Sequence, residues 1–165
     1  LYSNGKRKLL FLYNSTSQSA KRKLDGFLKG CKSLKEPKDK FDTLLCEEND
    51  IDSIISLLGD FFEKEFFPEG IVASDDFLAM IVLKFAKQNN IEVPKELSVV
   101  GYDNSIFSKL SYPELTTIDS GLFSLCEHSV NTLLKVFDGE SPENICLLKP
   151  DIIERDTFRS KTDTL

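Results

Sequence analysis

Residues 68 to 120 read PEGIVASDDFLAMIVLKFAKQNNIEVPKELSVVGYDNSIFSKLSYPELTTIDS, and this segment is the most informative about the fold. Two apolar segments in it run directly into acidic residues. The first, Ile71–Ser74, is followed by Asp75 and Asp76, and the second, Leu97–Tyr102, is followed by Asp103. In an open parallel sheet the carboxyl ends of the strands share one edge, and small molecules bind there. The stretch therefore predicts an α/β fold with an acidic binding edge.

The rest of the chain continues this alternation, which is typical of an open parallel sheet with helices on both faces. Strands are predicted at Lys8–Tyr13, Phe41–Cys46, Gly70–Ser74, Leu97–Tyr102 and Leu115–Ile118, and a last one is divided by Pro150 into Ile145–Leu148 and Ile152–Ile153. Apolar residues at helical spacing predict helices over Ala20–Leu34, Ile51–Phe66, Phe77–Phe85 and Leu122–Phe137. The remaining long segment, Asn104–Glu114, is predicted to be an irregular loop.

Several short polar side chains stand where a helix is predicted to begin. Asp50, Asp76 and Ser120 can each cap a helix by accepting a hydrogen bond from its first turn. Asp75 has no such duty, so its carboxylate is free to accept hydrogen bonds from ligand hydroxyls. Asp103 projects at the same edge, and the alternative for it is a turn-forming Asp-Asn pair.

Three cationic residues, Lys21, Arg22 and Lys23, lie in the first turn of the first long helix, where positive charge opposes the helix dipole. Either they face solvent, or one of them reaches a ligand or an acidic residue of the edge. We therefore single out five candidate binding residues: Asp75, Asp103, Lys23, Arg22 and Ser120.

Composition excludes several classes of protein. The chain has 165 residues, of which 41% are hydrophobic, and this suits one domain with a substantial core. Its formal net charge of -6 repels a phosphate backbone, so the segment is a poor candidate for direct contact with nucleic acid. No apolar run approaches the roughly 18 residues that a membrane span needs.

The chemistry-bearing residues form no recognisable catalytic or metal motif. The cysteines make no C-x-x-C pair and His128 is the single histidine, so we expect no metal and no cofactor. No glycine-rich phosphate loop is present, and no nucleophile motif accompanies His128. We therefore expect no enzyme. Cys31, Cys46 and Cys126 occupy apolar positions and are predicted to be buried thiols of a cytoplasmic protein.

The predicted helix Leu122–Phe137 carries a wide apolar stripe. The strand–helix units before it already pair with one another. At roughly 25 cal/mol per Å², leaving several such side chains in water costs several kcal/mol. We therefore expect this helix to cover a part of the protein outside this chain.

Five short motifs occur in a fixed order: KRKLDGF at 21–27, ASDDFLAM at 73–80, VPKELSVVGYD at 93–103, PELTT at 113–117 and ERDT at 154–157. In this order and spacing they resemble the effector-binding region of the lactose/galactose-repressor family of bacterial transcription regulators. The resemblance covers roughly Lys6 to Phe158.

The resemblance implies a fold like that of type I periplasmic sugar-binding proteins, in which two α/β lobes close on a sugar or a related polyol. Residues 1–118 would be the carboxy-terminal lobe, residues 119–148 a returning helix and strand of the other lobe, and residues 149–165 the final strand and tail. Closure would shift a homodimer between states that bind and release operator DNA. A helix-turn-helix headpiece outside this chain would contact that DNA.

The resemblance also assigns roles to residues. Asp103 matches an aspartate that hydrogen-bonds effector, Asp75 stands where the family usually has a ligand-contacting Asn, and Ser120 lies near a polar contact. Lys23 aligns with the family arginine, with Arg22 beside it. Because Asp75 and Lys23 depart from the family pattern, the effector is expected to be polyhydroxylated or cationic rather than a plain neutral sugar.

The helix Phe77–Phe85 and the loop Asn104–Tyr112 resemble the family's dimer surface. The residues expected to line it here are Phe77, Met80, Ile81 and Phe107. Two alternatives to a regulator remain open. One is a sugar-binding protein for transport or chemotaxis with the same fold, and the other is an enzyme of the doubly wound class. A headpiece upstream would decide for the regulator, and a signal peptide would decide for the transport protein.

Overall fold

The computed structural model describes residues 1–14, 16–34, 36, 39–47, 50–63, 67–141 and 147–160. Six strands form one sheet in the order β2-β1-β3-β4-β5-β6. All neighbours are parallel except β5 and β6, which are antiparallel. The strands are β1 (Lys8–Tyr13), β2 (Lys40–Leu45), β3 (Gly70–Ala73), β4 (Ser98–Tyr102), β5 (Thr116–Asp119) and β6 (Asp151–Ile153). The prediction of a mostly parallel α/β sheet is confirmed.

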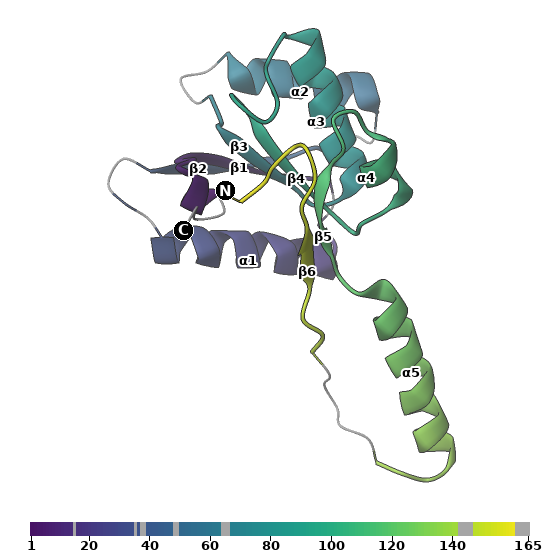
Figure 1. The fold of residues 1–165 in the computed structure, drawn as a ribbon. Helices are drawn as coiled ribbons and strands as arrows, with labels where there is room; N and C mark the ends of the chain where they lie inside the picture. The colour runs from purple at the N-terminus through teal and green to yellow at the C-terminus, as the bar shows by residue number, and fades with distance from the viewer. Residues whose placement is uncertain are drawn as a thin grey trace, which may run out of the picture.

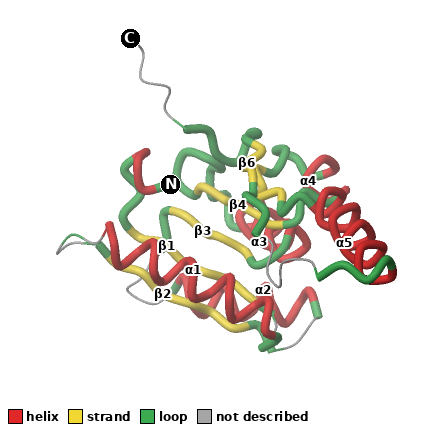
Figure 2. Tube along the Cα trace, turned by 90° about the horizontal axis from the view of Figure 1, so that it is seen from below, coloured by secondary structure: helices red, strands yellow, loops and turns green. Residues whose placement is uncertain are grey.

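Helices lie on both faces of this sheet, and one further helix lies apart from it. They are α1 (Gln18–Leu34), α2 (Ile51–Phe62), α3 (Asp76–Gln88), α4 (Ile106–Leu110) and α5 (Leu122–Phe137), with a short 3-10 helix at Tyr2–Asn4. Helix α1 lies on one side of the sheet, and α2 and α3 lie on the other (Figure 1). Figure 2, seen from the α1 side, shows α1 lying over β1 and β2 and running roughly in line with them.

The main core lies between the sheet and the pair α2 and α3. Alternate residues of the central strands β1, β3 and β4 point to it, as the period-2 geometry of a strand requires. The fully buried members include Leu10, Leu12, Ile71 and Val99 from the strands and Leu58, Leu78 and Val82 from the helices. On the other face the rings of Phe11 and Phe27 stack with their centroids 5.3 Å apart, so that α1 is held on β1.

Most predicted elements agree with the structure to within a few residues, but the segment Asn104–Glu114 does not. It was predicted to be irregular and instead contains the helix α4. A five-residue helix is too short to be stable alone. Here its start is fixed by Ser105, whose backbone N–H and hydroxyl both donate to the Asp76 carboxylate, at 2.6 and 2.9 Å.

The prediction for the last strand was also partly wrong. Only Asp151–Ile153 forms a strand, and Leu147 and Leu148 lie outside any strand. Ile145 falls outside the described residues, as does Phe66, which was placed at the end of the second helix. Strand β6 begins directly after Pro150, which cannot donate to a ladder of hydrogen bonds.

Helix α5 matches its predicted bounds and projects away from the rest of the chain (Figure 1). It has no buried residue, and Phe123 and Phe137 are 83% and 75% exposed. Its start differs from the prediction, because Gly121 rather than Ser120 is the N-cap and no side chain caps the helix.

The described cysteines of the sheet region are buried, and the one on α5 is exposed. Cys31 and Cys46 are buried, as predicted, and desolvation raises the pKa of both thiols to about 11. Cys126 lies on α5 and is exposed, so the prediction that it is buried is wrong for this chain. Cys146 falls outside the described residues.

Candidate functional site

The carboxyl ends of β3, β4 and β5 bring polar residues to one edge of the sheet. Strand β3 runs into Ser74 and Asp75, β4 into Asp103, and β5 ends at Asp119. Because β3 and β4 are direct parallel neighbours, Asp75 and Asp103 leave adjacent strands at the same edge. The expected acidic edge is therefore present in the fold.

Lys23 reaches this edge from the first turns of α1. Its ammonium nitrogen donates to the Ser74 carbonyl at 2.8 Å and lies 3.5 Å from the Asp103 carboxylate. The same nitrogen lies 3.8 Å from the centroid of the Tyr102 ring, close enough for a cation–π interaction. Lys23 thus connects α1 to the ends of β3 and β4, and only 20% of its side chain is exposed.

The helix-capping role predicted for Asp76 belongs to Asp75 instead. Asp75 caps α3, since its carboxylate accepts from the backbone N–H of Leu78 at 2.8 Å. Its second oxygen accepts from the Ser74 hydroxyl at 3.2 Å. Asp76, predicted to be the cap, is instead 1% exposed and points into the protein. A local pattern cannot separate two adjacent aspartates, because the choice depends on what lies under the helix.

Beneath Asp76, residues from two other elements complete its hydrogen bonds. Its carboxylate accepts from Ser105 at the start of α4 and from the hydroxyl of Thr117 in β5. A side chain at Gly101 would collide with this carboxylate and with Leu115. Glycine at position 101 therefore makes the room in which Asp76 ties α3, α4 and β5 together.

Asp103 combines an unusual backbone with partial exposure. Its φ is 98°, in the left-handed region that non-glycine residues rarely adopt, and its side chain is 48% exposed. Partial desolvation raises the pKa of this carboxyl above its ordinary value, Lys23 opposes the rise, and the charges of Asp76 and Asp75 add to it. Asp103 is thus a strained, only partly compensated carboxylate at an open edge.

A cleft opens beside this cluster, between α1 and the sheet. Its volume is about 720 Å³. It is lined by Phe11, Gln18, Ser19, Arg22, Lys23, Gly26, Phe27, Val72, Tyr102 and Ile118. The strand residues supply an apolar floor and α1 supplies the polar groups, which is the usual composition of a small-molecule site.

The structure brings some candidates together and leaves others apart. Lys23, Asp103 and Asp75 meet at the edge, and Arg22 is exposed on the wall of the cleft. Ser120 is half-buried after the end of β5. Among the described residues, no group of three or more His, Cys, Asp or Glu side chains is placed to hold a metal ion.

The four residues assigned to a dimer surface differ in their exposure. Phe77 and Met80 are half-buried, and Phe107 is 40% exposed with its ring centroid 5.9 Å from that of Phe77. Ile81 is 3% exposed and belongs to the core, so it does not lie on a free surface.

Sequence reasoning missed Ser74, Tyr102, Asn104 and Arg155. Arg155 was quoted only as part of the ERDT motif, yet it donates to the side chain of Asn104 at 2.9 Å. The available signal was weak, because the two residues are 51 positions apart in the chain.

No helix in the described part of the chain is long and apolar enough to cross a membrane.

Comparison with protein families matches residues 1–158 to the periplasmic binding protein-like domain. An HTH-type transcriptional regulator of Lachnoclostridium phytofermentans is 31% identical over 157 residues, which are 95% of this chain and 47% of the relative. The sucrose operon repressor of Streptococcus mutans is 42% identical over 71 residues, which are 43% of this chain and 22% of the relative. The chain thus spans about half or less of these curated relatives.

Solved structures show the same fold. A periplasmic binding protein/LacI transcriptional regulator from Alkaliphilus metalliredigens, complexed with D-xylulofuranose, has a TM-score of 0.79 and 24% identity over 96% of this chain and 59% of its own. A lac repressor dimer bound to operator and an anti-inducer has a TM-score of 0.81 and 23% identity over 95% of this chain and 54% of its own. The chain belongs to the family of periplasmic binding protein-like domains, and its resemblance to the lactose/galactose-repressor regulators is confirmed.

Proposed function

We propose that this chain is the effector-sensing part of a bacterial transcription regulator and that it binds a sugar or a related polyol. One observation carries the proposal: Lys23 and Asp103 meet at the edge of the sheet beside a cleft of about 720 Å³. The named relatives, which are transcription regulators, support it. So does the neighbouring structure that holds a bound furanose.

The chemistry of the edge suits hydroxyl groups. A hydroxyl both donates and accepts, so one hydroxyl can donate to the Asp103 carboxylate while a second accepts from the Lys23 ammonium. Charge-assisted hydrogen bonds of this kind are about twice as strong as neutral ones. Arg22, Ser120 and the second oxygen of Asp75 are proposed as further contacts, since Asp75 already caps α3 with its first oxygen.

The exposed helix α5 supports a second lobe outside this chain. We infer that residues 1–118 form one lobe, that residues 119–148 belong to the other, and that the tail from residue 149 completes the first. The upstream part of the protein would carry a DNA-binding headpiece, so operator DNA is a proposed partner of the whole protein in the cytoplasm. The net charge of -6 fits a segment that does not itself contact DNA.

The test uses the whole regulator and a panel of sucrose, lactose, D-xylulose, D-ribose and myo-inositol. At least one of these compounds should raise the melting temperature and change the affinity for DNA carrying the promoter of the regulator's own gene. Lys23→Ala should remove both responses, while Lys95→Ala, at an exposed lysine that lies away from the cleft, should keep them. Sugar binding without any DNA binding would favour the transport protein. If the wild-type protein shows neither a higher melting temperature nor a changed affinity for DNA with any of these compounds, the proposal is contradicted.

A homodimer is the second part of the proposal, with α3 and α4 at its interface. Around Phe77, Met80 and Phe107, large apolar side chains remain exposed, namely Ile106 at 61%, Leu110 at 70% and Tyr112 at 94%. Such a contiguous patch is typical of a protein–protein interface. Phe107→Lys should convert the whole regulator to a monomer in analytical ultracentrifugation, because it places a charge in an apolar contact. Lys109→Glu, on the same short helix, is the control for a general change of charge and should leave the dimer intact. A dimer that survives Phe107→Lys would exclude this interface.

A further inference from the structure

The turn formed by Asp103 and Asn104 holds both residues in left-handed backbone, with φ of 98° and 46°. For a non-glycine residue such a conformation is unfavourable, and it persists where the surroundings fix it. Two backbone contacts contribute, since Asp103 N–H donates to the Ile118 carbonyl at 2.8 Å and Asn104 N–H donates to the Thr117 hydroxyl at 3.3 Å. Both tie the turn to β5.

The side chain of Asn104 makes two further contacts, and they join parts of the chain that run in opposite directions. Its amide nitrogen donates to the Asp119 carboxylate at 2.9 Å. Its amide oxygen accepts from the Arg155 guanidinium, also at 2.9 Å. Asp119 ends β5, where the chain leaves for α5, and Arg155 follows β6, where the chain has returned. One side chain thus bridges the outgoing and the returning connection.

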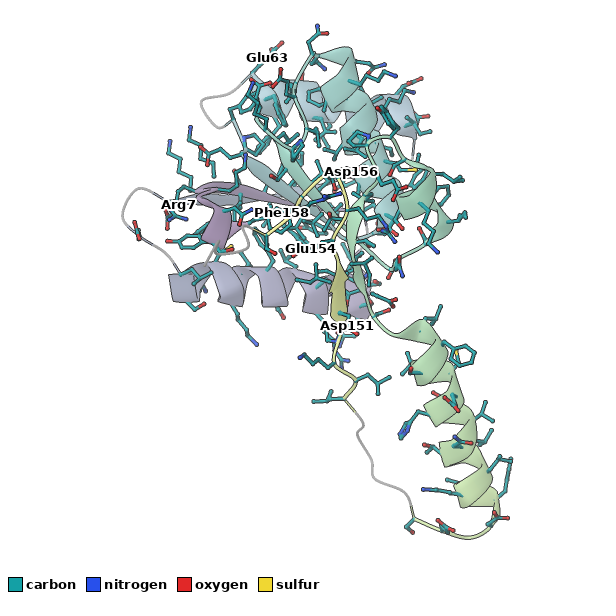
Figure 3. The ribbon with its side chains drawn as sticks, viewed as in Figure 1. Arg7, Glu63, Asp151, Glu154, Asp156 and Phe158 are labelled. Atoms are coloured by element: carbon teal, nitrogen blue, oxygen red, sulfur yellow. The ribbon has the colours of Figure 1, made fainter. Side chains whose placement is uncertain are left out.

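Each end of the bridge is itself anchored. The second oxygen of Asp119 accepts from the backbone N–H of Gly121, the N-cap residue of α5, at 2.8 Å. Arg155 donates to the Leu115 carbonyl at 2.7 Å, and only 11% of its side chain is exposed. Figure 3 shows the returning segment, labelled at Asp151, Glu154, Asp156 and Phe158, passing alongside β5. A continuous set of contacts therefore runs from the base of α5 to the turn that carries Asp103.

We propose that Asn104 is a positioning residue that holds Asp103 in its binding orientation and ties this turn to both connections of α5. The inference rests on the proposed function, because it takes Asp103 as an effector contact. A ligand that engages Asp103 would stiffen the turn and, through Asn104, the two connections. By linkage, a change that loosens the two connections would in turn weaken ligand binding at Asp103.

Asn104→Gly in the whole regulator isolates this role. Glycine adopts positive φ without cost, so the backbone is relieved rather than strained, while both side-chain hydrogen bonds are lost. Asn90→Gly is the matched control, because Asn90 also has a positive φ, of 56°, and is exposed just beyond the end of α3, away from the edge. The two variants make the same chemical change in the same kind of backbone.

The first measurement needs no ligand. Hydrogen exchange should become about tenfold faster or more in peptides that cover residues 103–105 and 119–121 of Asn104→Gly, because the variant loses both side-chain hydrogen bonds of Asn104. The same peptides should be unchanged in Asn90→Gly. Equal exchange in the two variants would overturn the bridging role, whether or not a sugar has been found.

The second measurement is calorimetric titration with a panel sugar that binds the wild-type protein. The dissociation constant should rise about tenfold in Asn104→Gly and stay unchanged in Asn90→Gly. Faster exchange with an unaltered dissociation constant would overturn the link between Asn104 and the effector. If the wild-type protein binds no panel sugar, the proposed function fails, and the exchange result still decides whether Asn104 bridges the two connections.

Discussion

The Asp103 side chain shows a conflict between stability and binding. The fold raises the pKa of this carboxyl, so the folded state disfavours its charged form. A group with a raised folded pKa destabilises the protein at a pH above that pKa, and the cost is relieved as the pH falls through it. Sites that bind ligands often carry such a cost.

The prediction is that Asp103→Asn raises the stability of the ligand-free protein at pH 7 and weakens sugar binding. Asparagine tolerates the same left-handed backbone, so the comparison isolates the charge. The gain should be less than about 1 kcal/mol, because solvent screens a half-exposed group. The loss of affinity should be about tenfold or more, since a charge-assisted hydrogen bond is removed. Melting curves from pH 4 to pH 7 and calorimetry measure the two effects, and a variant that is less stable at pH 7 would contradict the assignment.

At the element scale, α3 depends on its first two residues in different ways. Asp75 caps the helix and Asp76 fixes the start of α4 and part of β5. Asp75→Ala should therefore cost about 1 kcal/mol in free energy of unfolding, the usual loss for a removed N-cap. Asp50→Ala is the matched control on α2, where the Asp50 side chain accepts from Ser53 N–H at 2.9 Å. If urea titration shows the loss for Asp50→Ala but not for Asp75→Ala, the capping role is wrong.

Elements were predictable where a local pattern decides them. The apolar runs of β1 and β3 and the helical spacing of α5 gave bounds to within about one residue, because each depends on neighbours in the chain. Helix α4 was missed because it is short and is fixed by a carboxylate about thirty positions earlier. The edge itself followed from strand order, whereas the Asn104–Arg155 contact required the folded chain.

At the scale of the whole molecule, α5 has no partner within the described chain, and Leu125 and Leu133 are 46% and 53% exposed on it. Replacing both leucines with Glu should have different consequences in the isolated chain and in the whole regulator. In the isolated chain the change should lower self-association and dye binding to apolar surface, since it adds charge to a wet helix. In the whole regulator it should destabilise the protein by on the order of several kcal/mol, because the same face would be buried.

Lys135→Glu on the same helix controls for the added charge. Equal stability of the double variant and the wild type in the whole regulator would show that α5 is not covered there. The apolar stripe itself was evident from the sequence, but its direction away from the sheet was not. Gly121, which has a positive φ of 69°, is the N-cap between the end of β5 and the start of α5, and a positive φ at one glycine does not by itself give a helix direction.

We propose that Lys23 and Asp103 together hold the effector at the edge of the sheet. A crystal structure of the whole regulator with a bound panel sugar tests it most directly. We predict that sugar hydroxyls lie within hydrogen-bond distance of the Lys23 ammonium and the Asp103 carboxylate, and that the 3.5 Å contact between these two groups is replaced by contacts to the sugar. A sugar bound elsewhere, with the Lys23–Asp103 pair intact, would contradict the claim.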